Sequence, residues 1–101
     1  MLHGGLGNDA LFGGTRNDVV WGEAGADRLY GGNGGETADD GADSLIGGPG
    51  WDAFYGGIGD DSLNAQDGEA DRSIDGGDGT DTASLDCGLD PPPANVESTI
   101  C

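Results

Sequence analysis

Aspartate residues recur at regular positions along the 101-residue chain. Sixteen of the twenty acidic residues are aspartate, and most of them follow a short glycine-rich segment. The chain has three arginines and no lysine to balance these negative charges, so the formal net charge is −17. A carboxylate is a hard oxygen ligand, and the short aspartate side chain suits tight turns and metal sites. The chemistry that these residues could do is therefore the binding of cations.

The aspartates belong to a repeat with a period of nine residues. Eight rows cover residues 4–84. The row 31–46 is longer by seven residues, and the row 65–75 is longer by two and lacks the opening glycines. The regular rows are GGLGNDALF (4–12), GGTRNDVVW (13–21), GEAGADRLY (22–30), GGPGWDAFY (47–55), GGIGDDSLN (56–64) and GGDGTDTAS (76–84).

Each row carries two local signals. Its first half predicts a turn, because glycine permits positive φ angles and aspartate accepts local backbone hydrogen bonds. Its second half predicts a three-residue strand whose apolar middle side chain points inward. Strands this short are stable only when each stacks on an equivalent strand one coil away, which predicts an all-β solenoid. The middle residues are Leu11, Val20, Leu29, Leu45, Phe54, Leu63 and Ala83, with Ser73 or Ile74 in the irregular row.

The pattern resembles the GGxGxDxUx nonapeptide of the RTX (repeats-in-toxin) family, in which U is apolar. One isolated copy would mean little, but the periodicity from residue 4 to residue 84 makes the resemblance specific. It implies a right-handed parallel β-roll of about four coils, with two rows per coil and Ca²⁺ ions between neighbouring turns. It also implies a secreted, extracellular segment of a larger protein, which folds on binding about six ions.

In such a roll, rows two apart stack on the same edge, so the aspartates form two series. Asp9 and Asp27 are eighteen residues apart, whereas Asp18 and Asp43 are twenty-five apart, which equals eighteen plus the insertion. The insertion, residues 35–42, is therefore expected to loop out and leave the register intact. One edge carries Asp9, Asp27, Asp52 and Asp71, and the other carries Asp18, Asp43, Asp61 and Asp81.

The resemblance also implies a ligand set for each ion. One row would give the carbonyl oxygens of its positions two and four and its aspartate. The row one coil on would give the carbonyl oxygens of its positions one and three and its aspartate, so each aspartate would bridge two ions. The sites are Gly5, Gly7 and Asp9 with Gly22, Ala24 and Asp27; Glu23, Gly25 and Asp27 with Gly47, Pro49 and Asp52; and Gly57, Gly59 and Asp61 with Gly76, Asp78 and Asp81.

Several residues depart from the repeat where a ligand is expected. Arg16 stands at a fourth position, where a positive φ angle would strain its backbone. Glu23 replaces the second glycine of its row. In the irregular row, Asp67 competes with Asp71 for the ligand role. Two acids of the insertion that could supply extra ligands are Asp39 and Asp40.

Aromatic residues and the tail complete the predicted architecture. Phe12, Tyr30 and Tyr55 occupy the ninth position of alternate rows, so they should stack as an outward ladder on one sheet. Residues 1–86 are assigned to the roll, and residues 87–101 to an extended capping tail. In the tail, Val96 and Ile100 could cover the open end of the roll. A disulfide between Cys87 and Cys101 would close a fifteen-residue loop.

The sequence also argues against several functions. Its negative charge excludes nucleic acid and anionic membranes as partners, and its apolar runs are too short to span a bilayer. With His3 as the single histidine, and without a zinc-protease motif, nucleophile elbow or EF-hand loop, no enzyme and no EF-hand is expected. No signal peptide precedes the first glycine pair, which suggests a fragment, a mis-called start, or export that reads no N-terminal signal.

Two other interpretations stay open. An acidic, glycine-rich chain of this composition could be a disordered linker, although a linker would not keep apolar residues in phase with glycine pairs. Alternatively, the chain could be a structural or adhesive surface repeat. In that case calcium would only stiffen the roll, and the aromatic ladder would bind a partner.

Overall fold

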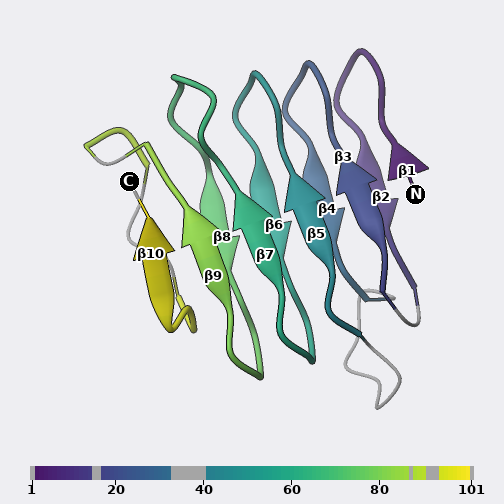
Figure 1. Cartoon of the computed structure of the whole chain (residues 1–101). Helices are drawn as coiled ribbons and strands as arrows, with labels where there is room; N and C mark the ends of the chain where they lie inside the picture. Colours follow the sequence, from purple (N-terminus) through teal and green to yellow (C-terminus); the bar gives the residue numbers. More distant parts are fainter. Residues whose placement is uncertain (1, 15–16, 33–40, 87, 91–93, 101) are drawn as a thin grey trace.

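The chain folds as an all-β solenoid with flat, parallel sheets on two sides (Figure 1). The structure, a computed structural model, describes residues 2–14, 17–32, 41–86, 88–90 and 94–100. Over these ranges it contains strands and turns and no helix, and therefore no helix that could cross a membrane. The all-β parallel roll predicted from the repeat is thereby confirmed.

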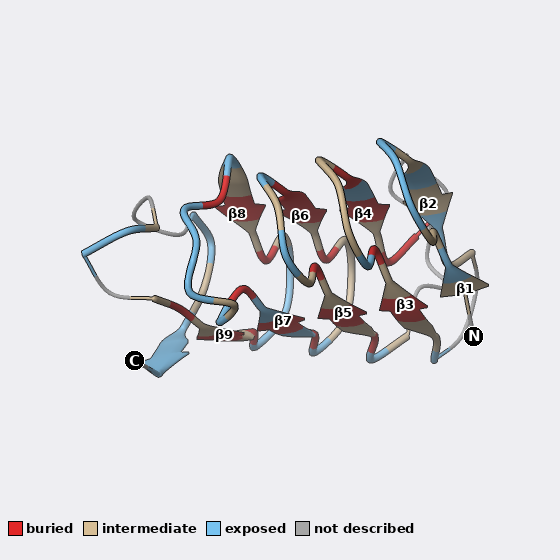
Figure 2. Ribbon diagram, turned by 90° about the horizontal axis from the view of Figure 1, so that it is seen from above, coloured by how far each residue is buried: buried red, intermediate tan, exposed pale blue. Residues whose placement is uncertain are grey.

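Consecutive strands along the chain belong to opposite sheets, except the last two, which belong to the same sheet (Figure 2). All pairings are parallel, and each strand pairs with the strand one coil away. The first sheet consists of β1 (Leu2–His3), β3 (Val19–Trp21), β5 (Ser44–Ile46), β7 (Ser62–Asn64), β9 (Thr82–Ser84) and β10 (Ser98–Ile100), in that order. The second consists of β2 (Ala10–Phe12), β4 (Arg28–Tyr30), β6 (Ala53–Tyr55) and β8 (Ser73–Asp75).

The insertion leaves the register of both sheets intact, as the spacing predicted. Val20 of β3 pairs with Leu45 of β5, and Leu29 of β4 pairs with Phe54 of β6, so partners on either side of the insertion are twenty-five residues apart. Leu45 pairs in turn with Leu63 at the ordinary spacing of eighteen. Asp39 and Asp40 of the insertion lie outside the described residues.

The core is a single column of apolar side chains between the two sheets. The middle residue of every strand from β3 to β9 is fully or almost fully buried, and Leu11 at the N-terminal end of the column is partly buried against it. The middle side chain points inward and its two neighbours point outward, because successive side chains of a strand point to opposite faces. The buried core residues are Val20, Leu29, Leu45, Phe54, Leu63, Ala65, Ile74, Ala83 and Leu85.

The irregular row keeps its place through a local bulge. Ile74, rather than Ser73, is the inward residue, and it pairs with Phe54. The backbone N–H groups of both Arg72 and Ser73 donate to the carbonyl oxygen of Asp52, at 2.7 and 3.3 Å. Two residues thus oppose one, which is how a bulge absorbs an extra residue without shifting the strand that follows.

The outward aromatic ladder is present on the second sheet. The rings of Phe12 and Tyr30 stack with centroids 4.6 Å apart, and those of Tyr30 and Tyr55 stack 4.9 Å apart. Each ring lies on a different coil, so the ladder ties three coils together on the outside of the roll.

The tail lies against the end of the roll in part. Ser98–Ile100 forms β10 and pairs with β9, and Val96 packs on the core cluster. Ile100 is exposed, and it pairs with Ser84 rather than with the inward residue Ala83. Successive side chains of a strand point to opposite faces, so Ile100 lies on the outward face of the sheet, and Val96 makes the tail's contact with the core. Cys87 and Cys101, and with them the proposed disulfide, lie outside the described residues.

Candidate metal centres along the turn edges

Hydrogen bonds connect the aspartates of each edge into a continuous ladder. The backbone N–H of each aspartate donates to a carboxylate oxygen of the acidic residue one coil further along: Oδ1 of an aspartate or, at the end of one edge, Oε1 of Glu97. The first four members of each ladder are the two series of aspartates predicted from the sequence. On one edge the bonds run Asp9–Asp27–Asp52–Asp71–Asp90, with donor–acceptor distances of 2.8, 2.8, 3.1 and 2.9 Å. On the other they run Asp18–Asp43–Asp61–Asp81–Glu97, with distances of 2.8, 2.8, 2.7 and 2.8 Å.

The last member of each ladder was missed by sequence reasoning. Asp90 lies nineteen residues after Asp71, the same interval as from Asp52 to Asp71, and it follows Gly88 with a φ angle of +97°. That spacing could have identified it. Glu97 gives no such signal, because it is a glutamate without flanking glycines and lies sixteen residues from its partner.

In seven of the ladder aspartates, the second carboxylate oxygen has no hydrogen-bond partner among the described residues. Water cannot supply the missing hydrogen bonds to the most buried of these residues, because Asp52 and Asp81 are fully buried and Asp27 is 1% exposed. A buried acceptor without a partner costs about 1–3 kcal/mol, and more when it is charged. The orphaned Oδ2 atoms belong to Asp9, Asp18, Asp27, Asp52, Asp61, Asp71 and Asp81.

The orphaned oxygen faces a backbone carbonyl across the space beside the first glycine of its row. A Cβ added to Gly22 would lie 2.7 Å from Oδ2 of Asp27 and 2.8 Å from the carbonyl oxygen of Gly47. A Cβ on Gly56 would likewise lie 2.5 Å from the carbonyl oxygen of Gly76 and 2.6 Å from Oδ2 of Asp61. Two oxygens of each expected ligand set thus converge where a side chain is missing. The site beside Gly4 repeats this geometry with Asp9 and Gly22.

The other expected carbonyls also lie between neighbouring turns. The carbonyl oxygens of Pro49 and Asp78, both at position three, point back to the preceding coil and accept the N–H groups of Gly25 and Gly59, at 3.1 and 2.9 Å. The carbonyl of Gly57 points forward and accepts the N–H of Asp78 at 3.0 Å. A carbonyl oxygen has two lone pairs, so each can accept such a bond and still face a cation.

The close stacking explains the glycines and one exception. Gly25 has a φ angle of +124°, and a Cβ there would collide with the carbonyl of Gly7. Glu23 also has a positive φ angle, +68°, which is uncommon for a residue with a side chain. Its carboxylate lies 3.0 Å from Nδ1 of His3, on the neighbouring coil. The departure at Glu23 therefore keeps the backbone of the repeat, whereas Arg16 lies outside the described residues.

Burial raises the pKa values of several ladder aspartates. The pKa of Asp71 rises to about 8, those of Asp52 and Asp61 to about 7, and that of Asp81 to about 6. Loss of hydration is the largest cause in each case, neighbouring acids add to it, and the hydrogen bond from the preceding backbone N–H opposes it. These carboxylates are thus poised to lose their protons to a cation.

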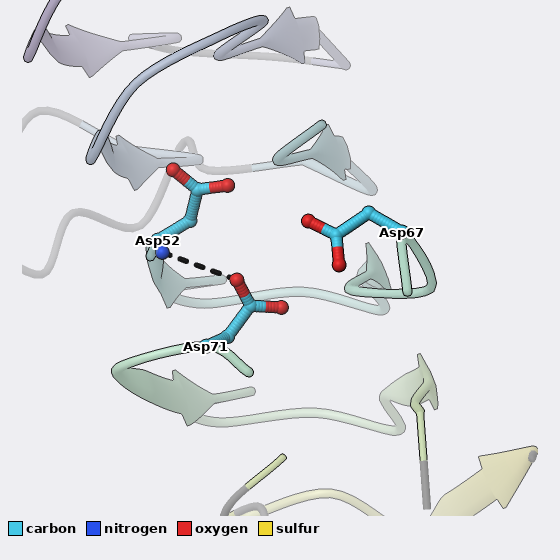
Figure 3. A group of neighbouring side chains, drawn as sticks. All are labelled: Asp52, Asp67 and Asp71. Carbon is cyan, nitrogen blue, oxygen red and sulfur yellow. Dashed lines mark hydrogen bonds between the residues drawn. The ribbon is translucent and has the colours of Figure 1, made fainter. Parts of the chain in front are cut away.

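In the irregular row, the structure brings Asp67 and Asp71 together beside Asp52. One oxygen from each of Asp52, Asp67 and Asp71 lies within 4.8 Å of the others, and the three carboxylates converge in Figure 3. Sequence reasoning treated Asp67 and Asp71 as alternatives because the row is two residues too long. The bulge after Asp71 absorbs one of the two extra residues. The other lies before Asp71, where hydrogen bonds from the turn at Asp67 to Asp86 fix the position of Asp67.

The comparison with protein families agrees with this geometry. The model of the RTX calcium-binding nonapeptide repeat matches residues 3–35 and 37–63, in four copies. The chain belongs to the RTX calcium-binding repeat family. Membership implies calcium binding, and these repeats bind metal rather than catalyse a reaction. Searches of curated proteins and of solved structures found no match.

The residues present fit the ion that the RTX family implies. The donors between turns are carboxylate and carbonyl oxygens, the hard ligands that Ca²⁺ prefers, and the seven orphaned Oδ2 atoms named above accept no hydrogen bond from the described residues. The rows after residue 63 lie beyond the family match. They nevertheless continue both hydrogen-bond ladders, through Asp71 and Asp81 to Asp90 and Glu97.

A pH dependence follows for the calcium-free RTX roll. Because the pKa values of buried aspartates are raised above 3.8, the folded state binds more protons than the unfolded state between about pH 4 and pH 8. Its stability should therefore fall as the pH rises through this window. Far-UV circular dichroism of metal-stripped protein should show more β-structure at pH 5 than at pH 8.

The control for this measurement is the same pH series at high salt. Salt screens repulsion between exposed carboxylates but acts little on buried ones. If high salt at pH 8 restores the signal as fully as acid does, general charge repulsion rather than the buried aspartates governs the transition, and the explanation from raised pKa values is wrong.

Proposed function

We propose that this chain binds several Ca²⁺ ions between successive turns and that ion binding completes its folding. The supporting observation is the row of buried Oδ2 atoms, of which those of Asp9, Asp27 and Asp61 face a carbonyl oxygen beside the first glycine of their row. Pairs of aspartates adjacent in the ladders define six positions within the repeat, which agrees with about six ions. The proposed ligands are those given above, from Gly5 to Asp81.

The energetic case for coupled folding rests on charge and on the small core. A net charge of −17 opposes compaction, and the largest fully buried apolar side chain is one phenylalanine. Bringing acidic side chains into the turns without a counter-ion costs hydration, as their raised pKa values indicate. An ion that binds only the folded chain adds its binding free energy directly to stability.

Coupled folding gives the module a use in export. A chain of this kind stays unfolded where calcium is scarce and folds in a calcium-rich extracellular medium. We therefore propose that it is a secreted segment of a larger exported protein, with neighbouring domains or repeats as its partners. This proposal rests on the family resemblance and on the dependence of the buried carboxylates on a cation.

The adhesive alternative has one structural feature in its favour, the exposed side of the aromatic ladder. Phe12 at its end is 46% exposed. However, the ring of Tyr30 is stacked between those of Phe12 and Tyr55, so a partner would meet its edge rather than a ring face. The geometry favours a structural role, in which the ladder stabilises the coils from outside.

The first experiment is a Ca²⁺ titration of metal-stripped protein, followed by far-UV circular dichroism, with Mg²⁺ in parallel. A cooperative gain of β-structure with Ca²⁺ alone is expected, because Mg²⁺ demands a stricter octahedral geometry and dehydrates reluctantly. An unchanged spectrum, or an equal response to Mg²⁺, would contradict the proposal and favour the disordered linker.

Asp27→Asn tests the bridging role of a ladder aspartate. Asparagine can still accept the N–H of Asp9 through its side-chain oxygen, but it removes one charged ligand from two proposed sites. We expect the Ca²⁺ midpoint to rise by about tenfold or more, since ligand charge tunes calcium affinity. Asp60→Asn is the matched control: Asp60 is exposed, and its Oδ1 accepts the N–H of Thr80 in the same manner. Equal midpoints for the two variants would refute the assigned register.

A double variant separates the structural and adhesive roles of the ladder. Tyr30→Ser with Tyr55→Ser should lower the stability of the calcium-loaded roll by about 1–3 kcal/mol, through lost stacking and apolar burial. Sedimentation of the unaltered protein in calcium should show a monomer at all concentrations. Calcium-dependent association that the double variant abolishes would instead support adhesion.

A further inference from the structure

Three carboxylates meet at one place on the first ladder edge. The ligand atoms of Asp52, Asp67 and Asp71 all lie within 4.8 Å of one another. That span is about twice the Ca–O bond length of about 2.4 Å, so one ion can contact all three. Asp52 is fully buried, and Asp71 is 4% exposed.

Each of the three carboxylates is held by one oxygen and has the other free. Oδ1 of Asp67 accepts the N–H of Glu69 at 2.8 Å, in a turn closed by the aspartate side chain. Oδ1 of Asp52 accepts the N–H of Asp27, and Oδ1 of Asp71 accepts the N–H of Asp52. The Oδ2 atoms of all three are buried and accept no hydrogen bond from the described residues.

The turn that carries Asp67 is fixed from the neighbouring coil. Oδ2 of Asp86 accepts the backbone N–H groups of both Asp67 and Gly68, each at 2.8 Å. The position of Asp67 is therefore set by three hydrogen bonds to its own turn and the next one. A side chain held in this way loses little further freedom on binding an ion, which favours affinity.

Asp67 occupies a place where the other rows offer only backbone. It precedes Asp71 by four residues, as Gly48 precedes Asp52, so it stands at position two of its row. In the other described rows this position is a glycine or Glu23, and Glu23 turns its carboxylate to His3. The site between Asp52 and Asp71 thus has three carboxylates, where the repeat supplies two.

We propose that Asp67 is a third carboxylate ligand and that the site it completes binds hard cations more tightly than the other sites of the roll. The inference rests on the proposed function, because it assumes that the turns bind Ca²⁺. Higher ligand charge raises calcium affinity and favours trivalent lanthanide ions even more strongly. The site is therefore the first to fill, and the coils around it are the first to be ordered by metal.

Terbium luminescence can test the order of filling. Trp51 directly precedes Asp52, so Tb³⁺ in this site should be sensitised by tryptophan-selective excitation, which acts over short range. We expect the emission to rise with the first equivalent of Tb³⁺ added to the whole chain. Trp51→Phe should remove this early emission, whereas Trp21→Phe, on the other sheet, should keep it. Early emission that persists in Trp51→Phe would overturn the proposal.

Asp67→Asn tests the ligand directly. Asparagine keeps the acceptor for the N–H of Glu69 and removes only the charge. The Tb³⁺ concentration at half-maximal early emission should rise by about tenfold or more, while Asp60→Asn leaves it unchanged. If Asp67→Asn behaves as Asp60→Asn does, Asp67 is no ligand and the inference fails.

The two proposals can fail separately. A Ca²⁺-induced gain of β-structure in the unaltered chain, with no effect of Asp67→Asn on the tightest step, would overturn this inference and leave the proposed function standing. Absence of any Ca²⁺ response in the unaltered chain would overturn both. If Asp67→Asn does not fold, loss of the early emission in Trp51→Phe still places the first ion beside Asp52, and Asp71→Asn against Asp27→Asn then tells on which side of Asp52 it binds.

Discussion

The fold depends on what happens to the two oxygens of a buried aspartate. One oxygen accepts the backbone N–H of the preceding coil, and this bond recurs along both edges of the roll. In Asp27, Asp52 and Asp81, for example, the other oxygen is buried, and no described group donates to it. A protein interior tolerates such an atom only if a proton or a cation occupies it. The stability of the roll and its affinity for metal are therefore two descriptions of one equilibrium.

This arrangement links each row to its neighbours and to little else. The Oδ1 bond sets the height of one coil on the next, the strands repeat that spacing in both sheets, and the apolar column fills the space between them. An aspartate such as Asp52 takes part in the bond before it and the bond after it. Changing its charge or geometry should affect the coils on both sides, which makes the assembly of the roll cooperative.

The sequence was sufficient where the chain repeats. The spacing of the aspartates predicted the ladder register, and the insertion did not obscure it, because extra residues at a turn leave strand pairing unchanged. It was not sufficient where the repeat breaks. The choice between Ser73 and Ile74 depended on a bulge opposite Asp52. The convergence of Asp67 with Asp71 depended on a turn held by Asp86 of the neighbouring coil. Glu97 closes a ladder from a segment without any motif, so only its position in space identifies its role.

The direction of the strands has a mechanical consequence. The strands run across the long axis of the roll, and β1 and β10 lie at opposite ends of the six-stranded sheet (Figure 1). Tension applied between the two ends would therefore act along the hydrogen bonds between coils. The layers of hydrogen bonds would open one after another, rather than many bonds being sheared at once. The roll should extend in small steps at low force, each step opening one layer of turns. In a longer chain it would act as a compliant spacer whose stiffness follows the calcium concentration.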